Sequence, residues 1–71
     1  MNKLQSIREN AGLTRTQAAA AIGDECQKNV SYSSLYMWER QKAIPPLDVV
    51  LAMTVVYDID LLELVNAILG Q

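Results

Sequence analysis

The stretch VSYSSLYMWERQK, residues 30–42, determines how the rest of this sequence is interpreted. Leu35 and Trp38 lie three residues apart, so in a helix they share one stripe that can face a core. The other side chains, which carry hydroxyls, a thioether and positive charge, fall on the remaining faces and are free to meet a partner. Ser31 is a favourable N-cap residue. The stretch therefore predicts a helix over residues 31–41 with an inward apolar stripe and an outward face suited to reading DNA.

On both sides of this stretch, the helical spacing of apolar residues and the presence of good capping residues predict four more helices. Thr14 is an N-cap before an alanine-rich run that Gly23 ends, and either Asp58 or Asp60 can cap the last helix. Asn2 can cap the first. The expected helices are residues 2–10, 15–22, 31–41, 47–57 and 61–69. We therefore expect one all-α domain spanning residues 1–71.

Two segments between these helices are predicted to be connections. Residues 24–29, DECQKN, are polar and read as a long turn, with room for a single helical turn. Residues 43–46 form an extended connector, because a residue before proline avoids the α region. The fourth helix is expected to bury a wide apolar face made of Leu47, Val50, Leu51, Met53 and Val56.

Composition excludes several classes of protein. The lone Cys26 excludes an intramolecular disulfide and a cysteine-based zinc site, and the sequence contains no histidine, the commonest general base. No apolar run is long enough to span a membrane, and the N-terminus does not resemble a signal peptide. We expect a cytoplasmic protein that is not an enzyme, with no metal, no cofactor and no small-molecule ligand.

The net charge of −2 and the pI of about 4.8 argue against a DNA-binding protein, since such domains are usually basic. The distribution of charge reduces this objection. All six lysines and arginines lie within the first 42 residues, while the last third carries acids only. One face of the protein can therefore be locally positive.

The last expected helix is apolar on nearly every side, and a terminal helix of so small a domain cannot bury its whole circumference internally. The leftover apolar surface predicts a homodimer contact, formed by Leu62, Val65, Ile68 and Leu69. The simpler alternative is that this helix only closes the core.

In this order, the segments resemble the Xre family of helix-turn-helix proteins, which includes phage repressors and Cro proteins. The resemblance rests on LxxIRENAGLT at residues 4–14, AxxIG at 19–23, VSxSxLxxWERxK at 30–42, and LDxVLA through IDLLEL at 47–64. It implies a compact five-helix fold like that of lambda repressor, in which the second and third helices form the helix-turn-helix, here with an extended turn.

The resemblance also implies roles for individual residues. Arg8 and Glu39 match positions that commonly form a buried ion pair. Tyr32, Ser33 and Met37 match positions that read base edges in the major groove. Positions that contact phosphate or sugar are matched by Arg15, Ser34, Tyr36, Arg40 and Lys42. In one departure from the family, Gln41 stands where glycine is common. In another, residues 24–29 are an insertion, which is expected either to tilt the third helix or to reach the DNA backbone through Lys28 and Asn29.

Two functions remain open. The first is a sequence-specific transcriptional regulator of the Cro or repressor type, from a phage or prophage, that binds a roughly palindromic operator on double-stranded DNA as a dimer. The second is an antitoxin or anti-repressor that keeps the fold but binds a protein through acidic and apolar surface. The acidic pI favours the second, whereas the basic residues and the hydroxyl-rich stretch at 30–42 favour the first.

Overall fold

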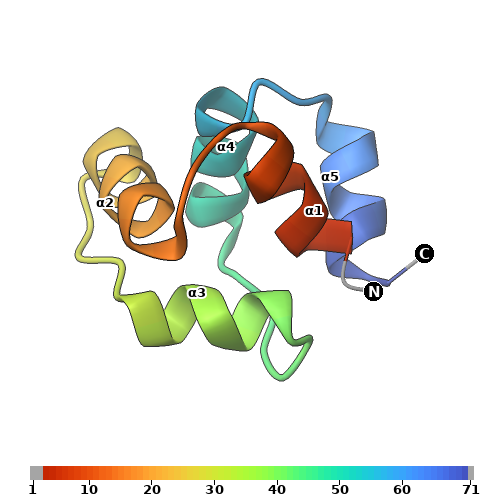
Figure 1. The fold of residues 1–71 in the computed structure, drawn as a ribbon, viewed down its shortest axis with the longest axis horizontal. Coiled ribbons are helices and arrows are strands. Elements are labelled where there is room, and N and C mark those ends of the chain that lie inside the picture. The colour runs from red at the N-terminus through yellow and green to blue at the C-terminus, as the bar shows by residue number, and fades with distance from the viewer. Residues whose placement is uncertain (1–2, 71) are drawn as a thin grey trace.

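The structure is a computed structural model that describes residues 3–70. Its five helices are α1 (Lys3–Asn10), α2 (Arg15–Cys26), α3 (Tyr32–Glu39), α4 (Leu47–Val56) and α5 (Leu61–Ile68). No strand occurs among residues 3–70, so the prediction of an all-α, five-helix fold is confirmed. None of the described helices is long and apolar enough to cross a membrane. In Figure 1, α1, α4 and α5 lie together, α2 flanks them, and α3 runs along one edge of the molecule.

Side-chain caps begin three of the helices, as predicted. The Thr14 hydroxyl accepts a hydrogen bond from the Gln17 backbone N–H, and the Gln17 side chain accepts one from the Thr14 N–H, which completes a capping box. Ser31 caps α3 by accepting from the Ser34 N–H at 3.0 Å. Of the two alternatives for α5, Asp60 is the cap. The expected cap at Asn2 lies outside the described residues.

The prediction that α2 ends at Gly23 is wrong, because the helix continues to Cys26. Residues 24–26, the first half of the expected long turn, are therefore helical. Gln27 ends it in the left-handed conformation, with φ of 56°. Gly23 has another role. The chain folds back over it, so a Cβ at this position would lie 2.7 Å from the Lys28 carbonyl oxygen. Gly23 therefore permits a close backbone approach within the helix-turn-helix.

The other helices end within two residues of their predicted limits. α3 stops at Glu39 rather than at residue 41, since Gln41 adopts a left-handed φ of 59°. This conformation explains why glycine is common there in the family that the sequence resembles, because glycine reaches positive φ without steric cost.

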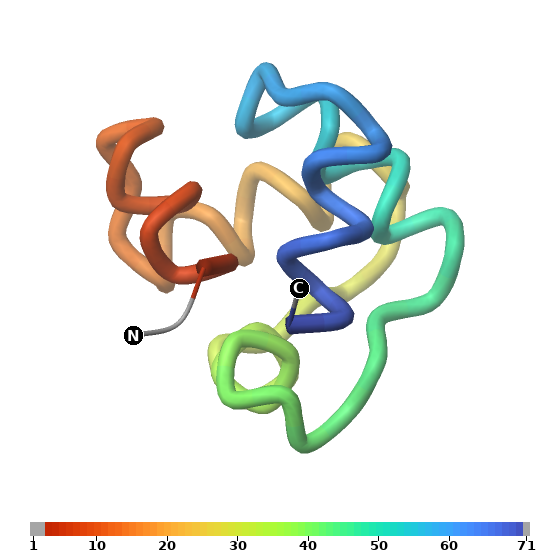
Figure 2. The backbone as a smooth tube through the Cα atoms, turned by 90° about the vertical axis from the view of Figure 1, so that its right-hand side faces the viewer, coloured from red at the N-terminus to blue at the C-terminus, as the bar shows by residue number. Residues whose placement is uncertain are grey.

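The core is aliphatic and lies where the helices converge. The largest fully buried apolar side chains are Leu4, Ile22, Leu35, Val49, Met53 and Leu64. Ala18 and Ala19 are also buried, and their small side chains let α2 pack closely against α4. Trp38 belongs to this core, as expected from its stripe. In Figure 2 the chain of α5 runs from the upper bundle down towards α3, whose axis is seen nearly end-on.

The prediction for the buried face of α4 is wrong in part. Val50 and Met53 are buried as expected, but Leu47 and Leu51 are exposed, and Val49 takes their place in the core. Apolar residues occupy most positions of the helix, and its two polar residues, Asp48 and Thr54, do not mark out one polar face, so its sequence does not show which apolar side is buried. The position of α2 makes that choice.

Tyr57 is buried, and its hydroxyl has no hydrogen-bond partner among residues 3–70. Burial, and then the negative charge of Glu39, raise the pKa of Tyr57 well above its ordinary value. We expect Tyr57→Phe to raise the free energy of unfolding by about 1 kcal/mol, because it removes an unsatisfied buried hydroxyl.

This gain should widen above about pH 10, where the unfolded wild-type chain loses its Tyr57 proton while the folded chain retains it. The wild-type protein then loses stability with rising pH. The Phe variant does not show the part of this loss that comes from deprotonation of Tyr57 in the unfolded chain. Urea unfolding followed by Trp38 fluorescence at neutral and alkaline pH measures both effects. A destabilised variant would show that the hydroxyl is hydrogen-bonded in the folded protein.

Candidate nucleic-acid interface

α3 presents one face to the core and the opposite face to the outside. Leu35, Trp38 and Glu39 are buried, whereas Tyr32 and Met37 are 51% and 41% exposed. Ser33 is exposed as well, so the three residues predicted to read bases lie on the outer surface of one helix. Since α3 runs along an edge of the molecule, this surface is accessible (Figure 1).

A buried network of two arginines and one carboxylate holds α3 from the inside. Glu39 has no exposed surface, and its Oε2 accepts a hydrogen bond from Arg8 Nε at 2.7 Å. The ion pair between Arg8 and Glu39 that the resemblance implied is therefore present in the structure. Arg8 also donates to the Leu13 carbonyl at 2.8 Å, so one side chain joins α1, the following turn and α3.

The same carboxylate has a second cationic partner that the sequence did not indicate. Arg15, predicted to contact phosphate, donates from its Nε to Glu39 Oε1 at 2.8 Å. Its terminal nitrogens lie 3.4 Å from the Tyr32 hydroxyl and from Gln5 Oε1. Hydrogen bonds to Tyr32 and then to Glu39 raise the pKa of Arg15. Arg15 thus stands at the junction of the buried network and the outer surface of α3.

Two tyrosine rings and a third arginine complete this surface. The Arg15 guanidinium carbon lies 5.9 Å from the centre of the Tyr32 ring and 5.1 Å from that of the Tyr36 ring. The Arg40 guanidinium carbon lies 5.7 Å from the Tyr36 ring. These distances are within the range of cation–π attraction. Tyr36, predicted to contact phosphate or sugar, therefore also contacts two cations through its ring.

The other residues with a predicted role in phosphate contact have simpler surroundings. Ser34 is half-buried, and its hydroxyl accepts a hydrogen bond from the Ser31 hydroxyl at 3.0 Å. Lys42 is exposed in the turn after α3. Lys28, suggested to reach the DNA backbone, instead forms an ion pair with Asp48 at 2.6 Å that ties the turn before α3 to α4. This pairing raises the pKa of Lys28 and lowers that of Asp48.

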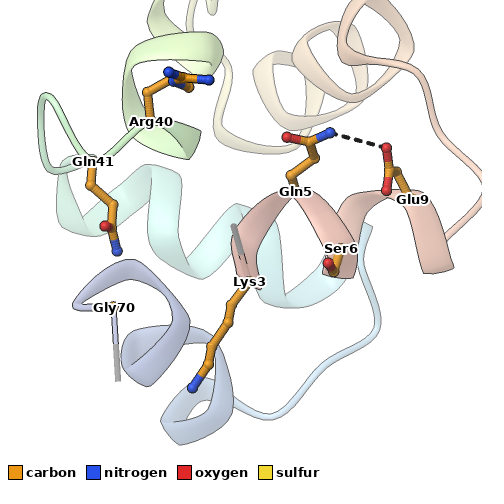
Figure 3. A pocket seen from close by; sticks show the side chains of 7 residues that line it. All are labelled: Lys3, Gln5, Ser6, Glu9, Arg40, Gln41 and Gly70. Carbon is orange, nitrogen blue, oxygen red and sulfur yellow. Dashed lines mark hydrogen bonds between the residues drawn. The ribbon is translucent and has the colours of Figure 1, made fainter. Parts of the chain in front are cut away.

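Beside the end of α3, an open polar groove is lined by residues of α1, by Arg40 and Gln41, and by Gly70, two residues after the end of α5 (Figure 3). Lys3 and Arg40 contribute its positive charge, and Gln41 points towards Gly70 across one end. Gln5 and Glu9 are joined by a hydrogen bond of 3.2 Å on the α1 side. Among the described residues, no group of three or more histidine, cysteine or acidic side chains is arranged to hold a metal ion.

The predicted dimer residues of α5 are not equally accessible. Leu62 and Leu69 are 68% and 55% exposed and Val65 is half-buried, but Ile68 is only 8% exposed and belongs to the core. Of the four predicted dimer residues, only Leu62, Val65 and Leu69 therefore have exposed surface to offer a partner, and Leu61, which was not predicted, is exposed as well.

Comparison with known families agrees with this geometry. A family model described as helix-turn-helix matches residues 4–64, which cover all of α2, α3 and α4 and most of the chain. No curated protein and no solved structure matches the chain. The matched family consists of DNA-binding regulators, and α3 is the second helix of the motif. The chain belongs to the Xre and Cro-like helix-turn-helix family.

Proposed function

We propose that this protein is a sequence-specific transcriptional regulator of the Cro or repressor type, encoded by a phage or prophage, that reads a roughly palindromic operator. The observation that supports this most directly is the outer surface of α3. Tyr32, Ser33 and Met37 are exposed together there, while Leu35 and Glu39 hold the helix from the inside. A helix held in this way can enter a major groove without disturbing the core.

In this proposal, direct readout has a limited chemical range. The Ser33 and Tyr32 hydroxyls can donate or accept hydrogen bonds at base edges, and Met37 can contact a thymine methyl group. Direct phosphate contacts come from Arg15, Ser34, Arg40 and Lys42, which flank this surface, and the Tyr36 ring lies between two of these residues. Such contacts set the position of the protein on the duplex and carry no sequence information directly.

The charge distribution is compatible with DNA binding despite the negative total. Arg8 and Arg15 share the single carboxylate of Glu39, so their network keeps one positive charge. Arg40 and Lys42 add to it at the end of α3, whereas the acids of the last third lie on α4, α5 and the turn between them. DNA would therefore meet the positive side of the molecule.

A palindromic operator requires two copies of the recognition helix. We propose that the copies associate through Leu62, Val65 and Leu69 of α5, with Ile68 supporting this surface from the core side. Exposed apolar surface of this kind is typical of protein interfaces. Recognition helices of such a dimer enter major grooves about one helical turn apart.

The competing function is an antitoxin or anti-repressor that binds a protein partner. One observation favours it: Leu47, Leu51 and Val55 follow one another at four-residue spacing on α4 and are all exposed. The net charge of −2 points in the same direction. The outcome of the DNA experiment separates the two functions.

Selection of bound sequences from a random pool of duplex DNA tests the proposal. The wild-type protein should enrich an inverted repeat with half-sites about one helical turn apart. The double variant Ser33→Arg/Met37→Ala should enrich a different sequence or none, because both side chains face the bases. Val55→Ala, on α4 away from α3, is the matched control and should enrich the wild-type sequence.

If the wild-type protein enriches nothing at low salt, at a concentration where it is dimeric, the DNA-binding function is wrong. A search for a protein partner of the α4 surface would then follow. An enriched sequence without a repeat would exclude the palindromic operator and keep DNA recognition.

A further inference from the structure

Four side chains alternate along the outer edge of α3: Tyr32, Arg15, Tyr36 and Arg40, which we call the tyrosine–arginine ladder. Tyr32 and Tyr36 lie one turn apart on α3, and Arg40 follows four residues later as the C-cap residue of that helix. Arg15 reaches this stripe from the start of α2, and its guanidinium carbon lies 5.9 and 5.1 Å from the centres of the two rings. The Tyr36 ring is therefore shared by two guanidinium groups, at 5.1 and 5.7 Å.

The two arginines of the ladder are held to different degrees. Arg15 is anchored by its hydrogen bond to the buried carboxylate of Glu39 and by the Tyr32 hydroxyl. Arg40 is exposed in the turn after α3, and its guanidinium lies against the Tyr36 ring. A free arginine side chain has about 2 kcal/mol of rotamer entropy to lose when it is fixed by a ligand. A ring that already restricts Arg40 reduces this loss.

The ring leaves the arginines able to bind an anion. The five N–H donors of a guanidinium group lie in its plane and point outward. Attraction between the positive charge and an aromatic ring uses none of these donors, so those that are not bonded within the protein can still bind phosphate. Tyr32 and Tyr36 are 51% and 39% exposed, Arg40 is exposed and the Arg15 side chain is 20% exposed, so every member of the ladder has surface open to solvent. The Tyr36 ring therefore brings two guanidinium groups to one part of the surface, at 5.1 and 5.7 Å from its centre.

We infer that Tyr36 is a positioning residue for phosphate binding, whose ring holds Arg15 and Arg40 in place, and that its hydroxyl is dispensable. This inference rests on the proposed DNA-binding function and gives the Tyr36 ring a positioning role in it. The ring, rather than the hydroxyl, sets the affinity for the DNA backbone. Phosphate binding does not depend on base sequence, so a random-sequence duplex is a sufficient probe.

The test measures the affinity of the full chain for a labelled random-sequence duplex at several salt concentrations. Tyr36→Leu should bind about tenfold more weakly at low salt, because it removes both cation–π interactions of the ring. Its plot of log affinity against log salt should become shallower by about 0.9 for each phosphate that the variant no longer neutralises. Tyr36→Phe should keep both the affinity and the slope of the wild-type protein.

A double-variant comparison tests whether the ring acts through Arg40. Arg40→Ala should weaken binding, and adding Tyr36→Leu to it should cost less than Tyr36→Leu costs alone, because one of the two arginines is already absent. Ile44→Ala, at an exposed position of the connector, is the control and should bind like the wild-type protein. Thermal unfolding of each variant, followed by circular dichroism, establishes that the helices are intact.

Three results would overturn the inference. Tyr36→Phe binding as weakly as Tyr36→Leu would show that the hydroxyl contacts phosphate directly. A folded Tyr36→Leu with wild-type affinity and slope would show that the ring has no role, while DNA binding itself stands. A wild-type protein that does not bind the duplex at low salt would contradict the proposed function as well. The first two results concern variants alone and would leave the proposed function standing.

Discussion

A Glu39→Met variant is expected to lose about 3–5 kcal/mol of unfolding free energy, because it leaves the buried Arg8 without its counter-charge. Glu39 is fully buried and serves two arginines, so no water can replace it without opening the core. Small domains have about 5–15 kcal/mol of stability in total, and this loss is a large part of it. Urea unfolding followed by circular dichroism measures the change.

Two further variants separate the contribution of each arginine. Arg8→Met should cost less, about 1–3 kcal/mol, because Glu39 keeps its hydrogen bond to Arg15 at 2.8 Å. The double variant Arg8→Met/Glu39→Met should be more stable than Glu39→Met, since the buried charge of Arg8 is removed together with its partner, while Arg15, whose side chain is 20% exposed, keeps contact with water. If Arg8→Met were as damaging as Glu39→Met, Arg15 would not share the carboxylate in solution.

Gly23→Val is expected to destabilise the protein by about 1–3 kcal/mol, towards the upper end of that range. The Cβ of any other residue would lie 2.7 Å from the Lys28 carbonyl oxygen. That oxygen belongs to the backbone, so relief of the contact requires the whole turn before α3 to move. The same movement would displace Ser31, the N-cap of the proposed recognition helix.

Ala20→Val is the matched control for this prediction. Ala20 is exposed on the same helix, and the change should cost about 0.5 kcal/mol through helix propensity alone. Thermal and urea unfolding of the two variants side by side give the difference. Equal destabilisation would mean that the turn accommodates the extra side chain and that the close approach at Gly23 is not needed.

The junction at Arg15 links stability to the proposed function. This side chain bonds the buried Glu39 at one end and contacts the exposed Tyr36 ring along its face. In the proposed function, a phosphate bound by Arg15 would therefore contact a side chain that also belongs to the buried network between α1 and α3. The geometry of the reading surface and the stability of the domain depend on the same carboxylate.

Local chemistry was enough to predict most of the helices and their beginnings. Thr14, Ser31 and Asp60 act as caps because a side-chain oxygen near a free N–H group depends on neighbouring residues only. The buried stripe of Leu35 and Trp38 follows from helical periodicity in the same way. Helix ends were harder to predict, because the left-handed positions Gln27 and Gln41 carry no glycine to mark them.

The number and order of the helices, the caps Thr14 and Ser31, the family, and the exposed residues of α3 all follow from the sequence alone. These features depend on short-range spacing and on side chains within a few residues of one another. Only the tertiary structure decided that Arg15 shares Glu39 with Arg8, that Gly23 lies under Lys28, and that Ile68 is buried while Leu47 is exposed. Each of these features depends on which segment, distant in the sequence, packs nearby. The sequence of a helix whose residues are mostly apolar does not show which of its sides a neighbouring helix will cover.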